Sequence, residues 1–239
     1  MSVLKNAISA FDPAPEKKEE IELALNLLYD LAQSKTDAFK KDIAQSLRTA
    51  GTEENPTIPI TQVLGAHSET RAYVSDDNSK IITETTDAIK KFVSGGSDNI
   101  INGIGSLLST GVNALLGTGT GIQSQREDYF VAVEGLAIIR VDVKSWIRKI
   151  NVQGITNKIE SVLAFTAVKS SVNVDKISFN TFLQAYKYQL ERTDIPQQEL
   201  IEEITNAKEI FNLLKTNDII AMNPSLESSV TNLPSSSLA

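Results

Sequence analysis

The chain has 239 residues, of which 41% are apolar and 22% are charged. These fractions are close to those of an average globular domain, so the chain can bury a core, and its length predicts one large domain. The formal net charge of −7 argues against a nucleic-acid-binding protein, because affinity for phosphate backbones comes from clustered Lys and Arg. The lack of cysteine excludes disulfide bonds, thiolate catalysis and the common zinc sites.

The N-terminal part of the chain predicts helices separated by proline breakers. Residues 3–11 carry an interrupted apolar run that favours a short helix over a secretory signal. After a breaker at 12–15, an acidic first turn begins a helix that is expected to end near Ser34. Thr36 has the character of an N-cap for a second helix, which predicts a helical hairpin. Residues 51–59 hold two prolines and a glycine and predict a linker.

Beyond the linker, a weak helical pattern at 62–67 precedes a stronger one at 81–93, which Gly95 and Gly96 are expected to end. The next segment, 99–125, contains no Asp, Glu, Lys or Arg. Its apolar residues are spaced by threes and fours, as one face of a helix requires. We predict that they contact a membrane or a partner: Ile100, Ile101, Ile104, Leu107, Leu108, Val112, Leu115 and Leu116.

The longest strong helical pattern runs from about 124 to 150, and its apolar residues cover more than one stripe. We therefore expect residues 98–150 to form a central antiparallel helical hairpin that turns at the glycines between 117 and 121. Further helices are predicted at 159–168, 179–190 and 200–214. Alternation with a period of two is scarce, although a short strand near Val74 or Val174 is compatible with the pattern.

These patterns predict an all-α fold: a single-domain bundle of seven or eight helices with a central long helical hairpin. The domain is expected to span residues 1–216, with the glycine-rich uncharged segment 99–125 inside it. Residues 217–239 are rich in Ser, Asn and Pro and predict a flexible tail.

No pattern in the sequence indicates a catalytic or metal centre. His67 is the only histidine, and a surface or packed structural role is favoured because no cysteine accompanies it. The glycines at 117, 119 and 121 lack the Lys-Ser or Lys-Thr pair of a phosphate loop. Paired acids such as Glu202 and Glu203 are expected to be solvated. The sequence therefore predicts no enzyme, no cofactor and no metal.

One charged pattern is regular: Arg140, Lys144 and Arg148 recur every fourth residue. Such a row pairs with acidic neighbours or is solvated in most proteins, and its functional interpretation is contact with an anionic surface such as lipid headgroups. Segment 99–125 is long enough to span a bilayer. However, only ten of its 27 residues are Ile, Leu, Val or Ala and six are Gly, which favours an interfacial or pore-lining amphipathic segment over a lone span.

Within this segment, the succession Gly103-Ile104-Gly105, Leu107-Leu108, Thr110-Gly111-Val112 and Ala114-Leu115-Leu116 is similar to lytic amphipathic peptides of the melittin kind. The basic tail of those peptides is missing. The resemblance implies membrane activity for this short segment only, and the chain as a whole resembles no family.

We therefore predict a non-enzymatic, membrane-active protein that inserts the glycine-rich segment as an amphipathic hairpin and forms homo-oligomers, as α-helical pore-forming toxins do. The alternative is a self-assembling structural or partner-binding helical protein in which the same segment is a subunit contact or buried core. An enzyme acting through carboxylates in a helical cavity is a third, less favoured hypothesis. The expected partners are membrane lipid or like subunits. We expect synthesis as a soluble cytoplasmic protein without a signal peptide and, if the protein is exported, a non-classical release.

Overall fold

The computed structural model has a mixed α/β fold and describes residues 15–73, 78–93, 97–116, 123–149, 161–192 and 195–216. Within these ranges, five α-helices accompany a four-stranded antiparallel sheet, so the predicted all-α bundle is wrong. The elements in chain order are α2 (Pro15–Thr49), β1 (Ile60–Tyr73), α3 (Asn78–Val93), α4 (Asp98–Leu116), β2 (Gln123–Glu134), β3 (Ala137–Lys149), β4 (Ser161–Val172), the 3-10 turn η1 (Val174–Lys176), α5 (Phe179–Leu190) and α6 (Gln197–Thr216).

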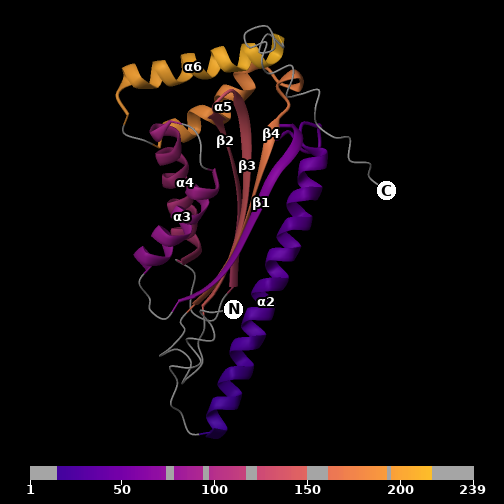
Figure 1. Ribbon diagram of the computed structural model, residues 1–239, viewed down its shortest axis with the longest axis vertical. Coiled ribbons are helices and arrows are strands. Elements are labelled where there is room, and N and C mark those ends of the chain that lie inside the picture. The colour runs from indigo at the N-terminus through magenta and orange to yellow at the C-terminus, as the bar shows by residue number, and fades with distance from the viewer. Residues whose placement is uncertain are drawn as a thin grey trace, which may run out of the picture.

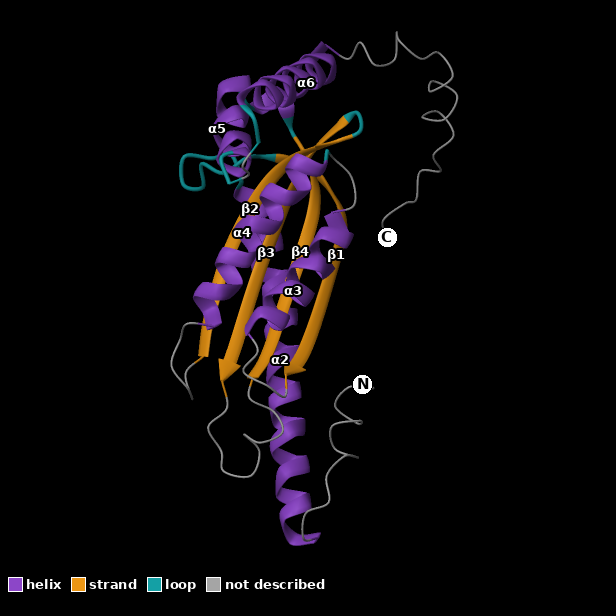
Figure 2. Cartoon of the chain, turned by 90° about the vertical axis from the view of Figure 1, so that its left-hand side faces the viewer, coloured by secondary structure: helices purple, strands orange, loops and turns teal. Residues whose placement is uncertain are grey.

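The strands lie in the order β1-β4-β3-β2, and every neighbouring pair is antiparallel. A tight turn at Gly135, whose φ is 60°, joins β2 to β3. β1 and β2 are therefore the two edges of the sheet, and the connection between them must cross one of its faces. Figure 2 shows α3 and α4 lying across that face, with α2 behind the sheet.

Helices cover both faces of the sheet, which explains why the central strands β3 and β4 are buried on both sides. On one face, Ile43 and Leu47 of α2 pack against Val168 of β4, and Thr166 donates a hydrogen bond to the backbone oxygen of Thr36. The other face carries the main core, shared with α3 and α4. α5 and α6 lie across one end of the sheet, as Figure 1 shows.

α2 is one continuous helix of 35 residues, not the predicted pair of helices broken near Thr36. Thr36 is buried inside the helix, and its hydroxyl donates to the backbone oxygen of Gln33 at 2.8 Å. A threonine that satisfies its own hydroxyl in this way is tolerated in a helix interior. The N-cap interpretation of Thr36 is therefore wrong.

The largest error concerns residues 123–149, which form the hairpin of β2 and β3 and not a central helix. β3 is buried on both faces over most of its length, so its apolar residues fall at spacings that fit a helix and a strand equally well. β-branched residues, including Ile139, Val141 and Val143, favour the strand. The predicted helical hairpin of 98–150 is accordingly half helix and half β-hairpin.

β1 replaces the weak helix expected at 62–67, and β4 replaces the helix expected at 159–168. The helices expected at 81–93, 179–190 and 200–214 correspond to α3, α5 and α6. Val174 lies in η1 and not in a strand. The predictions for 1–14, for Val74, for Gly95 and Gly96, for the turn at 117–121 and for the tail at 217–239 lie outside the described residues.

Candidate functional site

α4 carries the uncharged segment into the core of the domain. Six of its eight predicted contact residues are buried, and Ile101 and Leu107 are half-buried. The buried residues are Ile100, Ile104, Leu108, Val112, Leu115 and Leu116. They belong to the same core cluster as Phe130, Val141 and Leu163 of the sheet. In this structure the apolar face of α4 is therefore the inner face of a helical layer.

The start of α4 has the features of a stable helix N-terminus. Asp98 supplies negative charge in the first turn, where it interacts favourably with the helix dipole. The hydroxyl oxygen of Ser97 accepts a hydrogen bond from the backbone N–H of Ile100 at 3.4 Å. The helix is thus defined at its start by polar groups and along its length by apolar burial.

Two glycines of α4 lie where other side chains cross the helix. A Cβ atom on Gly105 would overlap with Cε of Lys90 from α3 and lie 2.7 Å from its Nζ. A Cβ atom on Gly111 would lie 3.0 Å from Nε of Arg126 on β2. Glycine at these positions permits close packing against α3 and against the sheet edge, which accounts for part of the glycine content of the segment.

The insert formed by α3 and α4 lies outside the hydrogen-bonded ladders of the sheet. Those ladders join β1 to β4, β4 to β3 and β3 to β2, and none includes a residue of α3 or α4. Within the insert, the hydroxyls of Thr86 and Ser109 lie 3.3 Å apart, at hydrogen-bond distance. The insert could therefore separate from the sheet without breaking any bond between strands.

Apolar burial contributes most to holding the insert in place, beside the ion pair of Glu84 with Arg71 and the hydrogen bond from Asn99 to Glu199. Removing a fully buried aliphatic side chain from its apolar surroundings costs about 1.5 to 3 kcal/mol, so exposing the six buried residues of α4 to water would cost roughly 10 kcal/mol or more. That cost exceeds the stability of many domains. The insert leaves the sheet only if another apolar surface receives it.

The predicted basic row lies on the opposite face of the sheet from α4. Arg140, Lys144 and Arg148 share one face of β3, because a spacing of four is even and therefore keeps side chains together on a strand as it does on a helix. That face is covered by α2, since Lys144 forms an ion pair with Asp42 of that helix at 3.2 Å. The structure thus separates the basic row from the apolar contact residues.

Arg140 is 1% exposed and is fully committed to partners inside the protein. Its Nη2 donates to Oδ1 of Asp142 at 2.6 Å, and its Nη1 donates to the backbone oxygen of Ile58 at 2.6 Å and to the hydroxyl of Thr57 at 2.9 Å. The guanidinium also lies 4.3 Å from the ring centre of Tyr129. Burial raises the pKa of the Asp142 carboxyl, while the hydrogen bonds from Arg140 act in the opposite direction. Arg140 joins the loop before β1 to the sheet.

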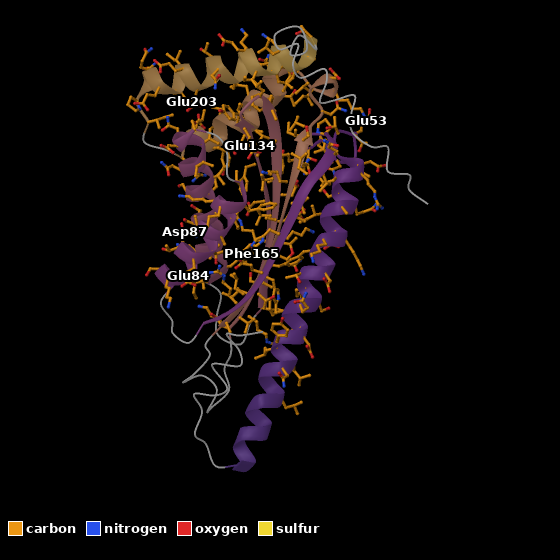
Figure 3. All side chains as sticks on the ribbon, viewed as in Figure 1. Glu53, Glu84, Asp87, Glu134, Phe165 and Glu203 are labelled. Carbon is orange, nitrogen blue, oxygen red and sulfur yellow. The ribbon has the colours of Figure 1, made fainter. Side chains whose placement is uncertain are left out.

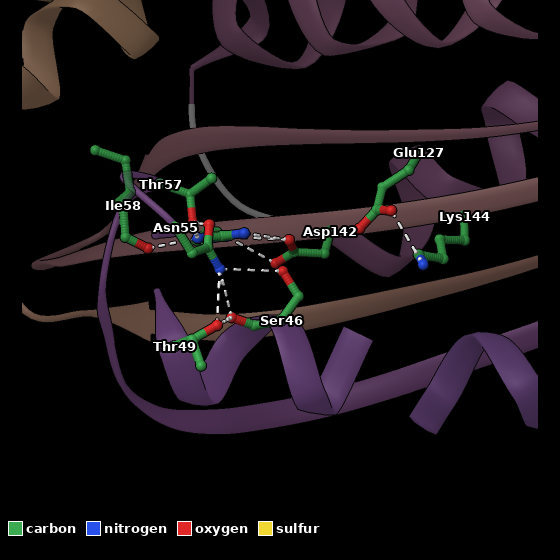
Figure 4. Close-up of polar contacts among 9 residues, drawn as sticks. Ser46, Thr49, Asn55, Thr57, Ile58, Glu127, Asp142 and Lys144 are labelled. Atoms are coloured by element: carbon green, nitrogen blue, oxygen red, sulfur yellow. Dashed lines mark hydrogen bonds and ion pairs between the residues drawn. The ribbon is translucent and has the colours of Figure 1, made fainter. Parts of the chain in front are cut away.

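Figure 4 shows this network and the neighbouring ion pair of Lys144 with Glu127. The Nζ atom of Lys144 lies 3.0 Å from the Glu127 carboxylate. Asn55 extends the network to α2 by donating to the backbone oxygen of Ser46 at 2.9 Å. Arg148 is half-buried. Two of the three residues predicted to contact an anionic surface therefore have carboxylate partners within the chain.

The described residues contain no group of three or more His, Cys, Asp or Glu that could hold a metal ion. Over the same part of the chain, no helix combines the length and the apolar character that a membrane crossing demands. His67 is half-buried, and its ring lies between Phe92 of α3 and Phe165 of β4, at 5.7 Å and 5.9 Å between centroids.

Comparison of the chain with models of known protein families finds no match, and comparison with curated proteins also finds none. The function is therefore inferred from the geometry of the chain itself. Sequence reasoning missed one set of residues that the structure brings together, His67, Glu69 and Arg71, because a weak helix was expected at 62–67 and no strand was predicted beyond it. The alternation of these residues with Ser68 and Thr70 is the period-two signal that could have identified them.

Proposed function

We propose that the protein is a non-enzymatic, membrane-active protein whose α3–α4 insert leaves the sheet and places the apolar face of α4 in a lipid surface. The observation that supports this proposal is the combination found in α4. Residues 99–116 carry no charge, their apolar face is buried against the sheet, and the insert takes no part in the strand ladders. A segment of this kind can exchange one apolar environment for another.

The energetics make the proposed release conditional. Exposure of α4 to water alone would cost roughly 10 kcal/mol or more. The closed state, in which the insert is packed on the sheet, is therefore strongly favoured in the absence of lipid. A lipid surface recovers most of that cost, because burial of the same side chains in acyl chains gives a comparable free energy. Binding of the released insert to the membrane therefore has to supply a free energy close to the cost of removing α4 from the core.

Self-assembly is the second candidate, and the edge strand β1 gives it an observation of its own. Val63 and Leu64 on β1 are 52% and 46% exposed, at the end of the strand where two register shifts interrupt its pairing with β4. Exposed apolar residues on an unpaired edge are typical of surfaces that meet another chain. The oligomer expected from the sequence would then form with α4 still in the core.

Dye release from anionic liposomes separates the two candidates when it is combined with light scattering in the absence of lipid. The membrane proposal predicts dye release and co-flotation with liposomes by a protein that is monomeric without lipid. Self-assembly predicts a defined oligomer without lipid and no dye release. A protein that neither floats with liposomes nor releases dye contradicts the membrane proposal.

A further inference from the structure

A hollow of about 490 Å³ opens between β1 and α3, on the face of the sheet that carries the insert. This volume is within the range of about 300 to 1,000 Å³ that is typical of small-molecule sites. β1 lines the hollow with His67, Glu69 and Arg71, which share one face because they alternate along the strand. α3 lines it with residues of one helical face, among them Glu84 and Asp87. Figure 3 shows Glu84 and Asp87 on α3 and Phe165 on the sheet.

The wall on β1 is a continuous chain of charged hydrogen bonds. Nε2 of His67 lies 2.8 Å from Oε1 of Glu69, and Nε of Arg71 donates to Oε2 of the same carboxylate at 2.6 Å. Nη1 of Arg71 donates in turn to Glu84 at 3.2 Å. Burial raises the pKa of Glu69, but the hydrogen bonds from Arg71 and His67 outweigh it and lower that pKa overall. These residues satisfy one another and hold the imidazole in a fixed position.

The fixed imidazole leaves one nitrogen for a ligand. Its Nε2 is engaged by Glu69, and within the described residues no group is at hydrogen-bond distance from Nδ1. The ring stacks on Phe92, which also lines the hollow, and contacts the buried Phe165 at a tilt. A ligand in the hollow therefore meets one imidazole nitrogen beside an aromatic ring.

Two opposite charges at the mouth of the hollow have no ion-pair partner among the described residues. Asp87 and Lys91 lie on α3, both are exposed, and both line the hollow. They are four residues apart on the helix, so their Cβ atoms are separated by about one helical turn, or roughly 6 Å. Glu84, by contrast, is already shared by Arg71 and Lys80. The hollow thus offers a carboxylate and an ammonium group that are both open to a ligand.

We propose that this hollow binds a phosphoethanolamine group, with its phosphate at Lys91 and its ammonium at Asp87, where Nδ1 of His67 can accept a further hydrogen bond from that ammonium. Opposite charges open to a ligand favour a zwitterion over a ligand of one sign. An α-amino acid carries both charges on groups bonded to one carbon, whereas phosphoethanolamine separates its phosphate and ammonium by a two-carbon chain and so reaches farther between the two side chains.

The surroundings of Phe92 favour a primary ammonium over the quaternary ammonium of phosphocholine. Recognition of a quaternary ammonium requires an open aromatic face. Here His67 stacks on the ring of Phe92, and Nζ of Lys169 lies 6.0 Å from its centroid. The Asp87 carboxylate can instead accept hydrogen bonds from a primary ammonium.

Phosphoethanolamine occurs as a soluble molecule and as a lipid headgroup, and the lipid form of the inference rests on the proposed membrane function. The inference for soluble phosphoethanolamine does not depend on that function. Because His67 is the only histidine, its imidazole gives a single reporter signal in NMR spectra of the full chain. Titration with soluble phosphoethanolamine tests the site without any membrane.

The expected result is a saturable shift of the His67 imidazole signals, at least tenfold weaker binding for Lys91→Gln, and unchanged binding for Lys40→Gln on α2, which lies on the opposite face of the sheet. Asp87→Asn is expected to weaken phosphoethanolamine binding but not the binding of inorganic phosphate, and phosphocholine should bind less tightly than phosphoethanolamine. The site assignment is overturned if the imidazole signals do not shift, or if Lys91→Gln and Lys40→Gln bind equally well.

A second arm identifies the source of the ligand. Flotation with vesicles of phosphatidylethanolamine and phosphatidylcholine is expected to show a preference for the former that Asp87→Asn removes. If soluble phosphoethanolamine binds and vesicles do not, the ligand is the soluble molecule and the lipid form of the inference fails while the site stands. The proposed membrane function is then decided separately by dye release from anionic liposomes. If vesicles bind equally well with Asp87→Asn, the lipid form of the inference fails.

Discussion

Gly111 of α4 lies directly against Arg126 of β2: a Cβ atom on the glycine would be 3.0 Å from Nε and 3.3 Å from Cδ of the arginine. Arg126 is itself held in place by Asp128, to which its Nη2 donates at 2.8 Å. This contact joins α4 to an edge of the sheet at a point where an added methyl group would require the Arg126 side chain to shift. It is the point at which the closed state can be tested most directly.

Gly105→Ala and Gly111→Ala should have different effects on stability. Replacing a helical glycine by alanine gains up to about 1 kcal/mol of helix propensity. At Gly105 the obstructing atoms are the end of the Lys90 side chain, which can swing away, so we expect stabilisation approaching that value. At Gly111 the obstructing guanidinium is held by Asp128, so overpacking should cancel the gain or reverse it. Urea denaturation measures both, and equal stabilisation by the two variants would contradict this packing.

The chain contains two Arg-X-Asp pairs on strands that differ in burial, which makes them a matched comparison. In the pair of Arg140 and Asp142 both side chains are at most 3% exposed, whereas Arg126 and Asp128 are 42% and 34% exposed. We expect Asp142→Ala to lower the free energy of unfolding by about 3 to 5 kcal/mol, because it leaves a buried guanidinium without its carboxylate. Asp128→Ala should cost less than about 1 kcal/mol. Similar costs for the two substitutions in urea denaturation would be incompatible with the buried network.

The lowered pKa of Glu69 predicts a pH dependence with a definite sign. A carboxyl whose pKa is lower in the folded state stabilises the fold above its ordinary value of 4.5 and loses that contribution as the pH falls through the folded-state pKa. Glu69→Gln should therefore be less stable than the wild type at pH 7, by no more than about 1 kcal/mol because the group is partly exposed. The difference should shrink below pH 4.5. Urea denaturation at several pH values checks this, and a difference that grows on acidification contradicts it.

Leu108→Ala tests whether weaker packing of α4 against the sheet favours release of the insert. Leu108 is 5% exposed in the core, so the substitution should lower the free energy of unfolding by about 2 to 5 kcal/mol. If release of the insert precedes membrane contact, the same variant should release dye faster than the wild type. Leu136→Ala, at a residue that is 56% exposed in the turn between β2 and β3, should change neither quantity. Destabilisation by Leu108→Ala without faster dye release would count against conditional release.

The helices of the insert and of the C-terminal end could be predicted because one face of each is apolar and the rest is polar. α3, α4, α5 and α6 all have this pattern, so a period near 3.6 is the only one that fits. The predicted division of α2 into two helices is wrong. A threonine gives the same signal in a sequence whether it caps a helix or, like Thr36, donates a hydrogen bond to the backbone oxygen of Gln33 within one.

The sheet could not be predicted in the same way because its central strands are buried on both faces. Ile138, Ile139 and Val141 are at most 1% exposed although they point to different sides, so alternation disappears from the sequence. The residues of the basic row share one face, as their spacing predicts, since a spacing of four fits a helix and a strand alike. Their partners, Asp142, Asp42 and Glu127, come partly from another element and could not be deduced from sequence.

The measurement that tests the central claim most directly is dye release by a protein whose α4 is tethered to the sheet. The chain has no cysteine, so Gly111→Cys combined with Arg126→Cys introduces one pair of thiols with no competitor. Gly105→Cys combined with Lys90→Cys is the matched control, because it links α4 to α3 and leaves the insert free to depart as a unit. Each contact involves the far end of a long side chain, so the two thiols of each variant are joined with a bifunctional thiol reagent whose spacer contains a cleavable disulfide. Cross-linking is verified before the assay.

Conditional release predicts that the cross-linked double variant at Gly111 and Arg126 binds no liposomes and releases no dye, and that reductive cleavage of the cross-link restores both activities. The cross-linked control should remain active. Dye release by the cross-linked, tethered protein at the rate of its cleaved form would contradict the proposal that α4 leaves the sheet.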